Sequence, residues 1–132
     1  MKKVIIIGGV LLVFVVVGLV LMFDKLDKDA EHILEEDITE ISLVGIADGT
    51  YTGEYMEALA TNAKVEVYVE NEEIVNLVIL AHSNGQGEDA ESILEDVLRE
   101  QSVMVDDVAG ATYSSRVIKL AIIDALRGDD HE

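Results

Sequence analysis

The chain has 132 residues, of which 27 are acidic and nine are basic, so its formal net charge is −18. So much negative charge excludes a protein that binds nucleic-acid phosphates. The chain has no Cys and only three His, which excludes disulfide scaffolds, thiolate metal sites, iron–sulfur clusters and His-rich metal sites.

The hydrophobic and the acidic residues occupy different parts of the chain. Half of all residues are hydrophobic and the mean hydropathy is +0.31, which is unusual for so acidic a protein. All 27 acids and seven of the nine basic residues follow position 23, so residues 24–132 carry a net charge of −20. The sequence therefore predicts an apolar N-terminal segment followed by an acidic domain of ordinary globular composition.

Residues 4–23 form an unbroken run without a charged or strongly polar side chain. A run of this length makes roughly 30 Å of helix, which is the thickness of a bilayer core. We therefore expect residues 1–23 to be an uncleaved transmembrane anchor. The alternative, a cleavable signal peptide, would have a shorter apolar run with a small-residue cleavage site after it.

The charges that flank the apolar run predict its orientation. Lys2 and Lys3 precede the run, whereas Asp24, Asp27 and Asp29 follow it. Basic flanks favour the cytoplasmic side of a membrane. We therefore expect a single pass through the cell membrane, with the N-terminus in the cytoplasm and the acidic domain outside it.

Residues 24–47 read as a membrane-proximal helical linker between the anchor and the domain. Apolar side chains recur there at a spacing of three to four residues, with acids between them, which is typical of an amphipathic helix. These side chains are Leu26, Ala30, Ile33, Leu34, Ile38 and Ile41.

Three stretches predict an antiparallel sheet at the start of the domain. Residues 49–55 follow a turn signal and read as a short strand. Residues 64–70 alternate valines with polar side chains, which is the pattern of a half-buried strand. A tight turn at residues 71–73 leads to residues 74–80, which are almost entirely apolar and predict a more central strand. The last two stretches form a β-hairpin.

The second half of the domain reads as two helices. Residues 88–100 carry one apolar stripe, with acids at the start and Arg99 near the end. A short extended piece over residues 101–105 and a loop lead to a last helix, which starts somewhere in residues 112–115, runs to about residue 127 and ends at Gly128. The predicted class is α+β, with the domain over residues 48–128 and a frayed tail at 129–132.

The informative stretch is residues 106–115, where Gly110 and Ala111 lead into a helix that opens with hydroxyl residues. Small residues let another group approach the backbone closely, and the first turn of a helix offers unpaired N–H groups and partial positive charge. This combination predicts a site for an anion such as phosphate. The alternative is an ordinary loop in which Thr112, Ser114 or Ser115 is the N-cap of the helix.

The order of these elements and the stretch from Asp106 to Thr112 resemble the FMN-binding domain of bacterial electron-transfer proteins. That family includes peripheral subunits of the Rnf complex and of the Na⁺-pumping NADH:quinone oxidoreductase. Its pattern Asp-x-x-(Ser/Thr)-Gly-Ala-Thr marks covalent flavinylation. The resemblance implies that a Mg²⁺-dependent flavin transferase takes FMN from FAD and joins its phosphate to the final Thr.

Matched residue by residue, the resemblance assigns Asp106 to the motif acid, Gly110 and Ala111 to the Gly-Ala pair, and Thr112 to the attachment point. Ala109 stands where the family commonly has Ser or Thr, which removes one hydroxyl but keeps the acceptor.

The resemblance also implies further contacts to the flavin and its phosphate. Tyr113 is a candidate neighbour of the ring, Ser114 and Ser115 are candidate hydrogen-bond donors to the phosphate, and the loop that holds His82, Gly85 and Gly87 comes near the flavin. Taken alone, His82 reads as an exposed residue at the end of a strand.

These features predict a membrane-anchored, extracytoplasmic electron carrier with FMN as its cofactor. We expect it to work as a redox carrier or subunit and not as a stand-alone enzyme. Its expected partners are the flavin transferase, a redox donor in the membrane and an external acceptor. Two alternatives stay open. One is a flavin-free acidic module that docks a membrane or surface partner, and the other is noncovalent binding of FMN or another phosphate ligand at the same helix.

Overall fold

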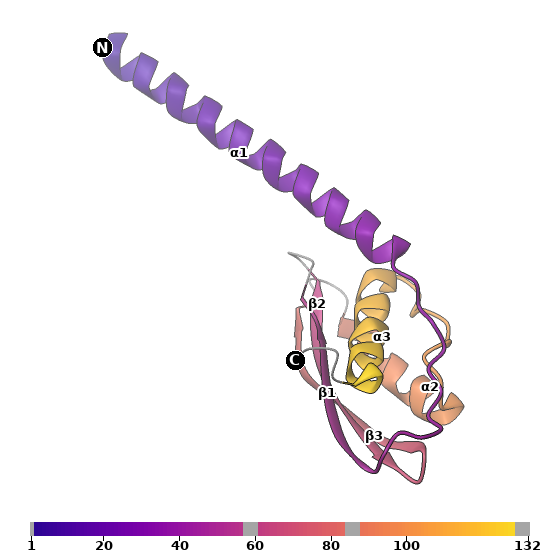
Figure 1. Cartoon of the computed structure of the whole chain (residues 1–132). Helices are drawn as coiled ribbons and strands as arrows, with labels where there is room; N and C mark the ends of the chain where they lie inside the picture. Colours follow the sequence, from indigo (N-terminus) through magenta and orange to yellow (C-terminus); the bar gives the residue numbers. More distant parts are fainter. Residues whose placement is uncertain (1, 57–60, 84–87, 129–132) are drawn as a thin grey trace.

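A long apolar helix leads into a small domain with one sheet and two further helices (Figure 1). The computed structural model describes residues 2–56, 61–83 and 88–128. Helix α1 (Lys2–Glu35) precedes the strands β1 (Gly49–Tyr55), β2 (Asn62–Glu70) and β3 (Glu73–Ser83), the short 3-10 helix η1 (Glu88–Ser92), and the helices α2 (Ile93–Glu100) and α3 (Thr112–Arg127). The predicted α+β class with an N-terminal apolar helix is confirmed.

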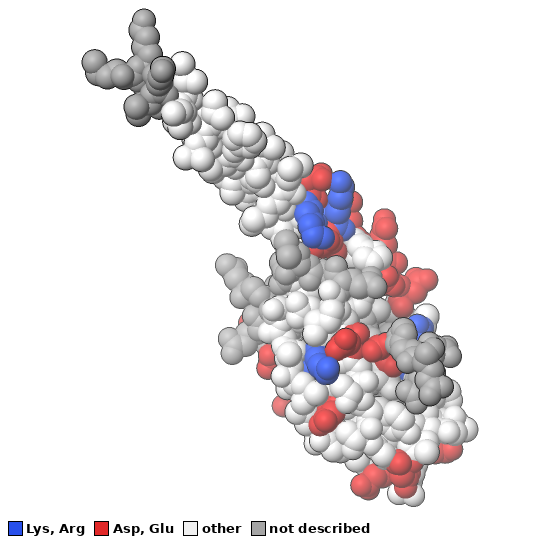
Figure 2. Space-filling model, turned by 60° about the vertical axis from the view of Figure 1, so that its left-hand side comes forward, with Lys and Arg blue, Asp and Glu red and all other residues white. Residues whose placement is uncertain are grey.

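Helix α1 is long and apolar enough over residues 6–35 to cross a membrane, and its most apolar window is not buried against the rest of the described chain. In Figure 2 the described part of the helix is free of charged side chains over most of its length, and basic and acidic side chains gather toward its domain end. Lys25 pairs there with Asp29, and Lys28 pairs with Asp24. With 34 residues, α1 is roughly 50 Å long, so it extends well beyond a bilayer core.

The helix predicted over residues 24–47 ends at Glu35, and residues 36–47 run as an extended connector along the domain. Four apolar side chains of this connector pack against the core instead of forming one face of a helix. They are Ile38, Ile41, Leu43 and Ile46. Arg127 Nη2 donates to Thr39 Oγ1 at 2.7 Å, and Ser102 Oγ donates to Glu40 Oε2 at 2.8 Å. An extended chain is long enough to reach these distant partners, whereas a helix of the same residues would be too short.

The three strands form one antiparallel sheet in the order β1-β2-β3, so β2 is the central strand. Its alternation is as predicted, with Ala63, Val65, Val67 and Val69 buried on the inner face. The prediction that residues 74–80 form a more central strand was wrong. Strand β3 lies at an edge, and its outer apolar side chains are exposed, so its apolar composition does not reflect burial on both faces.

Residues 101–105, predicted as extended, form turns and bends that join α2 to the loop before α3. Gln101 ends α2 with a φ of 54°, and its side-chain amide pairs with the backbone of β3. Gln101 Oε1 accepts from Ile74 N at 2.7 Å, and Nε2 donates to Ile74 O at 2.9 Å. These two hydrogen bonds hold the end of α2 against the edge strand, and they use the same backbone groups of Ile74 that a neighbouring strand would use.

Helix α3 confirms the predicted last helix, and it packs across the inner face of the sheet. Strand β1 touches the backbone of α3 at Gly53, where a Cβ atom would lie 2.2 Å from both Ala121 O and Ala125 N. Next to it, Glu54 N donates to Asp124 Oδ2 at 2.9 Å. These contacts fix α3 on the sheet and place its N-terminus at the end of the domain that adjoins α1 (Figure 1).

Candidate functional site

Thr112 is the first residue of α3, and its side chain is exposed. The N-cap of the helix is Ala111, which makes no side-chain capping hydrogen bond. The alternative in which a hydroxyl residue of this stretch is the N-cap was therefore wrong. The first N–H groups of a helix point out of its N-terminus, where the dipole is positive, and the Ala111 side chain cannot accept a hydrogen bond from them.

The backbone before Thr112 makes a tight turn that only glycine accommodates easily. Gly110 has a φ of +79°, a left-handed conformation, and the space that a Cβ would occupy there is open. Ala111 N donates to Val108 O at 2.9 Å and closes the turn. The predicted Gly-Ala pair therefore has a physical role, since it turns the chain into α3 and leaves room beside Thr112.

Ser114 and Ser115, predicted as phosphate donors, are both buried. Ser115 Oγ accepts a hydrogen bond from Val108 N at 3.0 Å, so this side chain holds the loop before α3. Thr112 and the neighbouring Tyr113, which is 44% exposed, are the outward-facing side chains of the first turn.

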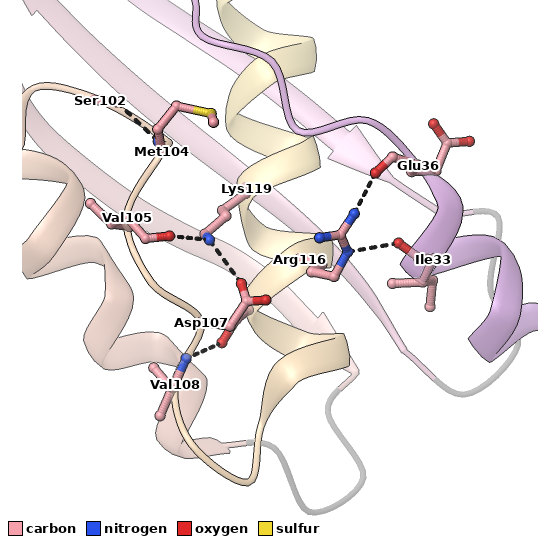
Figure 3. A network of polar contacts seen from close by, with 10 residues as sticks. Ile33, Glu36, Ser102, Met104, Val105, Asp107, Val108, Arg116 and Lys119 are labelled. Atoms are coloured by element: carbon pink, nitrogen blue, oxygen red, sulfur yellow. Dashed lines mark hydrogen bonds and ion pairs between the residues drawn. The ribbon is translucent and has the colours of Figure 1, made fainter.

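A buried lysine holds the loop from the other side, and sequence reasoning missed it. Lys119 is 4% exposed, and its Nζ donates to Asp107 Oδ1 at 2.8 Å and to Val105 O (Figure 3). The predicted motif acid, Asp106, is exposed, so it is the adjacent Asp107 that pairs with the helix. The signal in the sequence was a lone lysine among the apolar residues of the last helix.

We expect Lys119→Met to lower the free energy of unfolding by about 2 kcal/mol, because it removes the partner of Asp107 and leaves the Val105 carbonyl without its donor. Urea unfolding followed by circular dichroism measures this loss. The double variant Lys119→Met, Asp107→Asn recovers part of the loss, because no unpaired carboxylate remains. An unchanged midpoint in the single variant contradicts a role for Lys119 in holding the loop.

His82 lies near the end of β3, at the same end of the sheet as the N-terminus of α3 (Figure 1). Its side chain is 2% exposed, so the reading of His82 as an exposed strand-end residue was wrong. Nδ1 lies 3.2 Å from Glu91 Oε1 on η1, and η1 packs against α3. Nε2 is buried and has no hydrogen-bond partner among the described residues. A buried ring nitrogen without a partner suits a ligand that brings a polar group to it. Gly85 and Gly87 lie outside the described residues.

The candidate site lies in a part of the chain that matches a known protein family. The family model of the FMN-binding domain matches residues 58–127, which is more than half of the chain. The chain belongs to the FMN-binding domain family. A comparison with curated proteins finds no match.

The residues of this FMN-binding domain fit FMN in two respects. The uncapped start of α3, with the exposed Thr112 and the open space at Gly110, suits a phosphate group. The Nε2 of His82, at the same end of the sheet, suits a polar atom of a ligand. The matched range includes both features and ends at the last residue of α3, whereas β1 with its Gly53 precedes it.

Proposed function

We propose that this protein is a membrane-anchored electron carrier that holds FMN through a phosphoester to Thr112, outside the cytoplasm. The observation that carries the proposal is the exposed Thr112 hydroxyl at the uncapped N-terminus of α3, within an FMN-binding domain. The apolar run of α1 and the two lysines that precede this run support the membrane anchor and the orientation.

The attachment needs a hydroxyl nucleophile that a transferase can reach. Thr112 Oγ attacks the FMN-side phosphorus of FAD, and the bond from that phosphorus to the oxygen of the AMP phosphate breaks. AMP leaves with the electron pair, and the Thr112 proton passes to solvent. The flavin transferase supplies Mg²⁺, and the exposure of Thr112 lets its active site reach the hydroxyl.

The residues around Thr112 then hold the product. The first-turn N–H groups and the dipole of α3 stabilise the remaining negative charge of the phosphodiester. Tyr113 offers an exposed aromatic face beside the attachment point, and His82 Nε2 offers a buried polar contact. When bound, FMN supplies one- and two-electron chemistry, and the protein supplies its position and its electrostatic surroundings.

Co-expression with a flavin transferase tests the proposal. We expect a yellow protein whose flavin fluorescence stays with the polypeptide band on a denaturing gel, and whose mass rises by one FMN less one water. The same protein made without the transferase is the control. Yellow colour that is lost on denaturation would instead show noncovalent binding. A protein that stays colourless in both conditions would favour the flavin-free interaction module.

A further inference from the structure

The last turn of α1 docks on the domain. Ile33 is 1% exposed, although the large apolar side chains of α1 from Ile6 to Phe23 are about half exposed or more. The guanidinium of Arg116, on α3, reaches this turn, as Figure 3 shows. Arg116 Nε donates to Ile33 O at 2.9 Å, and Nη2 donates to Glu36 O. Among the described residues, the contacts of the anchor helix with the domain therefore include one fully buried apolar side chain and one arginine.

Arg116 suits this position because a helix end leaves carbonyl groups without partners. Glu36 N pairs with His32 O at 3.0 Å, and the carbonyls of Ile33 and Glu36 take their hydrogen bonds from Arg116. The positive charge also lies at the negative end of the α1 dipole. The fixed fork of a guanidinium spans two carbonyls, which a lysine ammonium does less well.

The stretch of chain between the end of α1 and the first contacts of the connector with the domain is short. The connector continues from Glu36 along the core, with Ile38 packed against it and Thr39 bonded to Arg127 at 2.7 Å. On α3, Arg116 lies one helical turn after Thr112, on the same side of the helix. The contact that ties the domain to its anchor and the candidate attachment point therefore belong to the same two turns of α3.

We propose that Arg116 is a positioning residue that latches the domain onto the end of α1, so that anchor and domain move as one rigid body with the N-terminus of α3 turned toward the bilayer. Residues 24–35 of α1 set the height, roughly 18 Å above the apolar segment. The β2–β3 turn lies at the opposite end of the domain (Figure 1). Together with the proposed function, on which this consequence rests, the latch directs the Thr112-linked flavin at a redox partner embedded in the membrane.

Spin-label distances test the latch in the full chain without flavin, so the result does not depend on flavinylation. Because the chain has no Cys, Lys28→Cys on α1 and Asn76→Cys on β3 introduce two exposed labels without background. In lipid nanodiscs we expect one narrow distance distribution. Arg116→Met should broaden it about twofold, since residues 36 and 37 then act as a flexible tether. Ile33→Ala gives a second, independent weakening of the same contact.

Arg99→Met is the matched control, because Arg99 is exposed on α2 and its ion pairs in the described part of the chain are with Asp96 and Glu100. We expect it to leave the distribution narrow. Circular dichroism checks that each variant is folded. A distance distribution in the parent that is already as broad as in Arg116→Met overturns the latch. The latch is also overturned if Arg116→Met and Ile33→Ala are both folded and both give distance distributions as narrow as that of the parent.

A separate measurement tests the proposed orientation, in which the N-terminus of α3 is turned toward the bilayer. A fluorophore at Tyr113→Cys, next to Thr112, should be quenched more strongly by headgroup-attached quenchers than one at Asn76→Cys, because the N-terminus of α3 faces the bilayer. Equal or stronger quenching at Asn76→Cys overturns the pose. Both measurements use apo protein, so a failure of the latch and a failure of flavin attachment are told apart.

Discussion

Thr112→Ala abolishes covalent flavin, while Thr112→Ser keeps it. The reason is chemical, since the alanine variant has no oxygen with which to form the phosphoester, and serine restores the hydroxyl at the same point of α3. We expect the gain of mass to disappear completely in Thr112→Ala and to remain in Thr112→Ser. Intact-mass spectrometry after co-expression with the transferase measures both.

Ser114→Ala is the matched control for Thr112→Ala. Ser114 is a hydroxyl residue of the same helical turn, but it is 3% exposed, so a transferase cannot reach it. We expect this variant to be flavinylated as fully as the parent. A folded Thr112→Ala protein that still carries covalent flavin would show that another residue is the acceptor.

Gly53→Ala should unfold much of the domain. The added Cβ would lie 2.2 Å from Ala121 O and Ala125 N and 2.7 Å from Ala125 Cα, all of which are backbone atoms of α3 that no side-chain rotation can move away. The strand and the helix must separate, and we expect the free energy of unfolding to fall by about 3 kcal/mol or more. Urea unfolding measures the change, and Gly53→Val should prevent folding altogether.

Gly49→Ala is the control for Gly53→Ala, because it makes the same substitution in the same strand. A Cβ at Gly49 would meet only the Tyr51 ring, at 3.9 Å, which is ordinary contact. We expect its stability to change by less than about 0.5 kcal/mol. Equal stability of the two variants would contradict the close approach of β1 to α3.

Much of the domain could be predicted because its local patterns and its packing agree. The alternating valines of β2 face the core, as a period of two requires, and α3 begins and ends where hydroxyl residues and Gly128 indicate. The stretch from Asp106 to Thr112 was predicted as a loop that leads into a helix, and the left-handed Gly110 gives that prediction its physical basis.

Other features depend on contacts that no local pattern reveals. The apolar residues of the connector repeat as an amphipathic helix would, yet Thr39 and Glu40 find partners along α3 and after α2, and the chain is extended to reach them. Strand β3 is apolar but lies at the edge, because which strand is central depends on the pairing of the whole sheet and not on composition.

The polar residues that support the site were the hardest to predict. No sequence pattern singled out Lys119 or Arg116, yet one is buried against Asp107 and the other caps α1. His82 likewise read as an exposed strand end, although η1 covers it and Glu91 binds it. Each of these residues acts through a contact with another element of the chain. No local spacing in a single sequence therefore predicts these roles.

Peptide mapping of the flavinylated protein tests the central claim most directly. Trypsin cleavage after Arg99 and Arg116 releases residues 100–116, which contain Thr112 together with Tyr113, Ser114 and Ser115. We predict that this peptide carries the mass of one FMN less one water, and that fragmentation places the whole addition on Thr112. An addition on any other residue, or a fully unmodified peptide from protein co-expressed with an active transferase, would contradict the account.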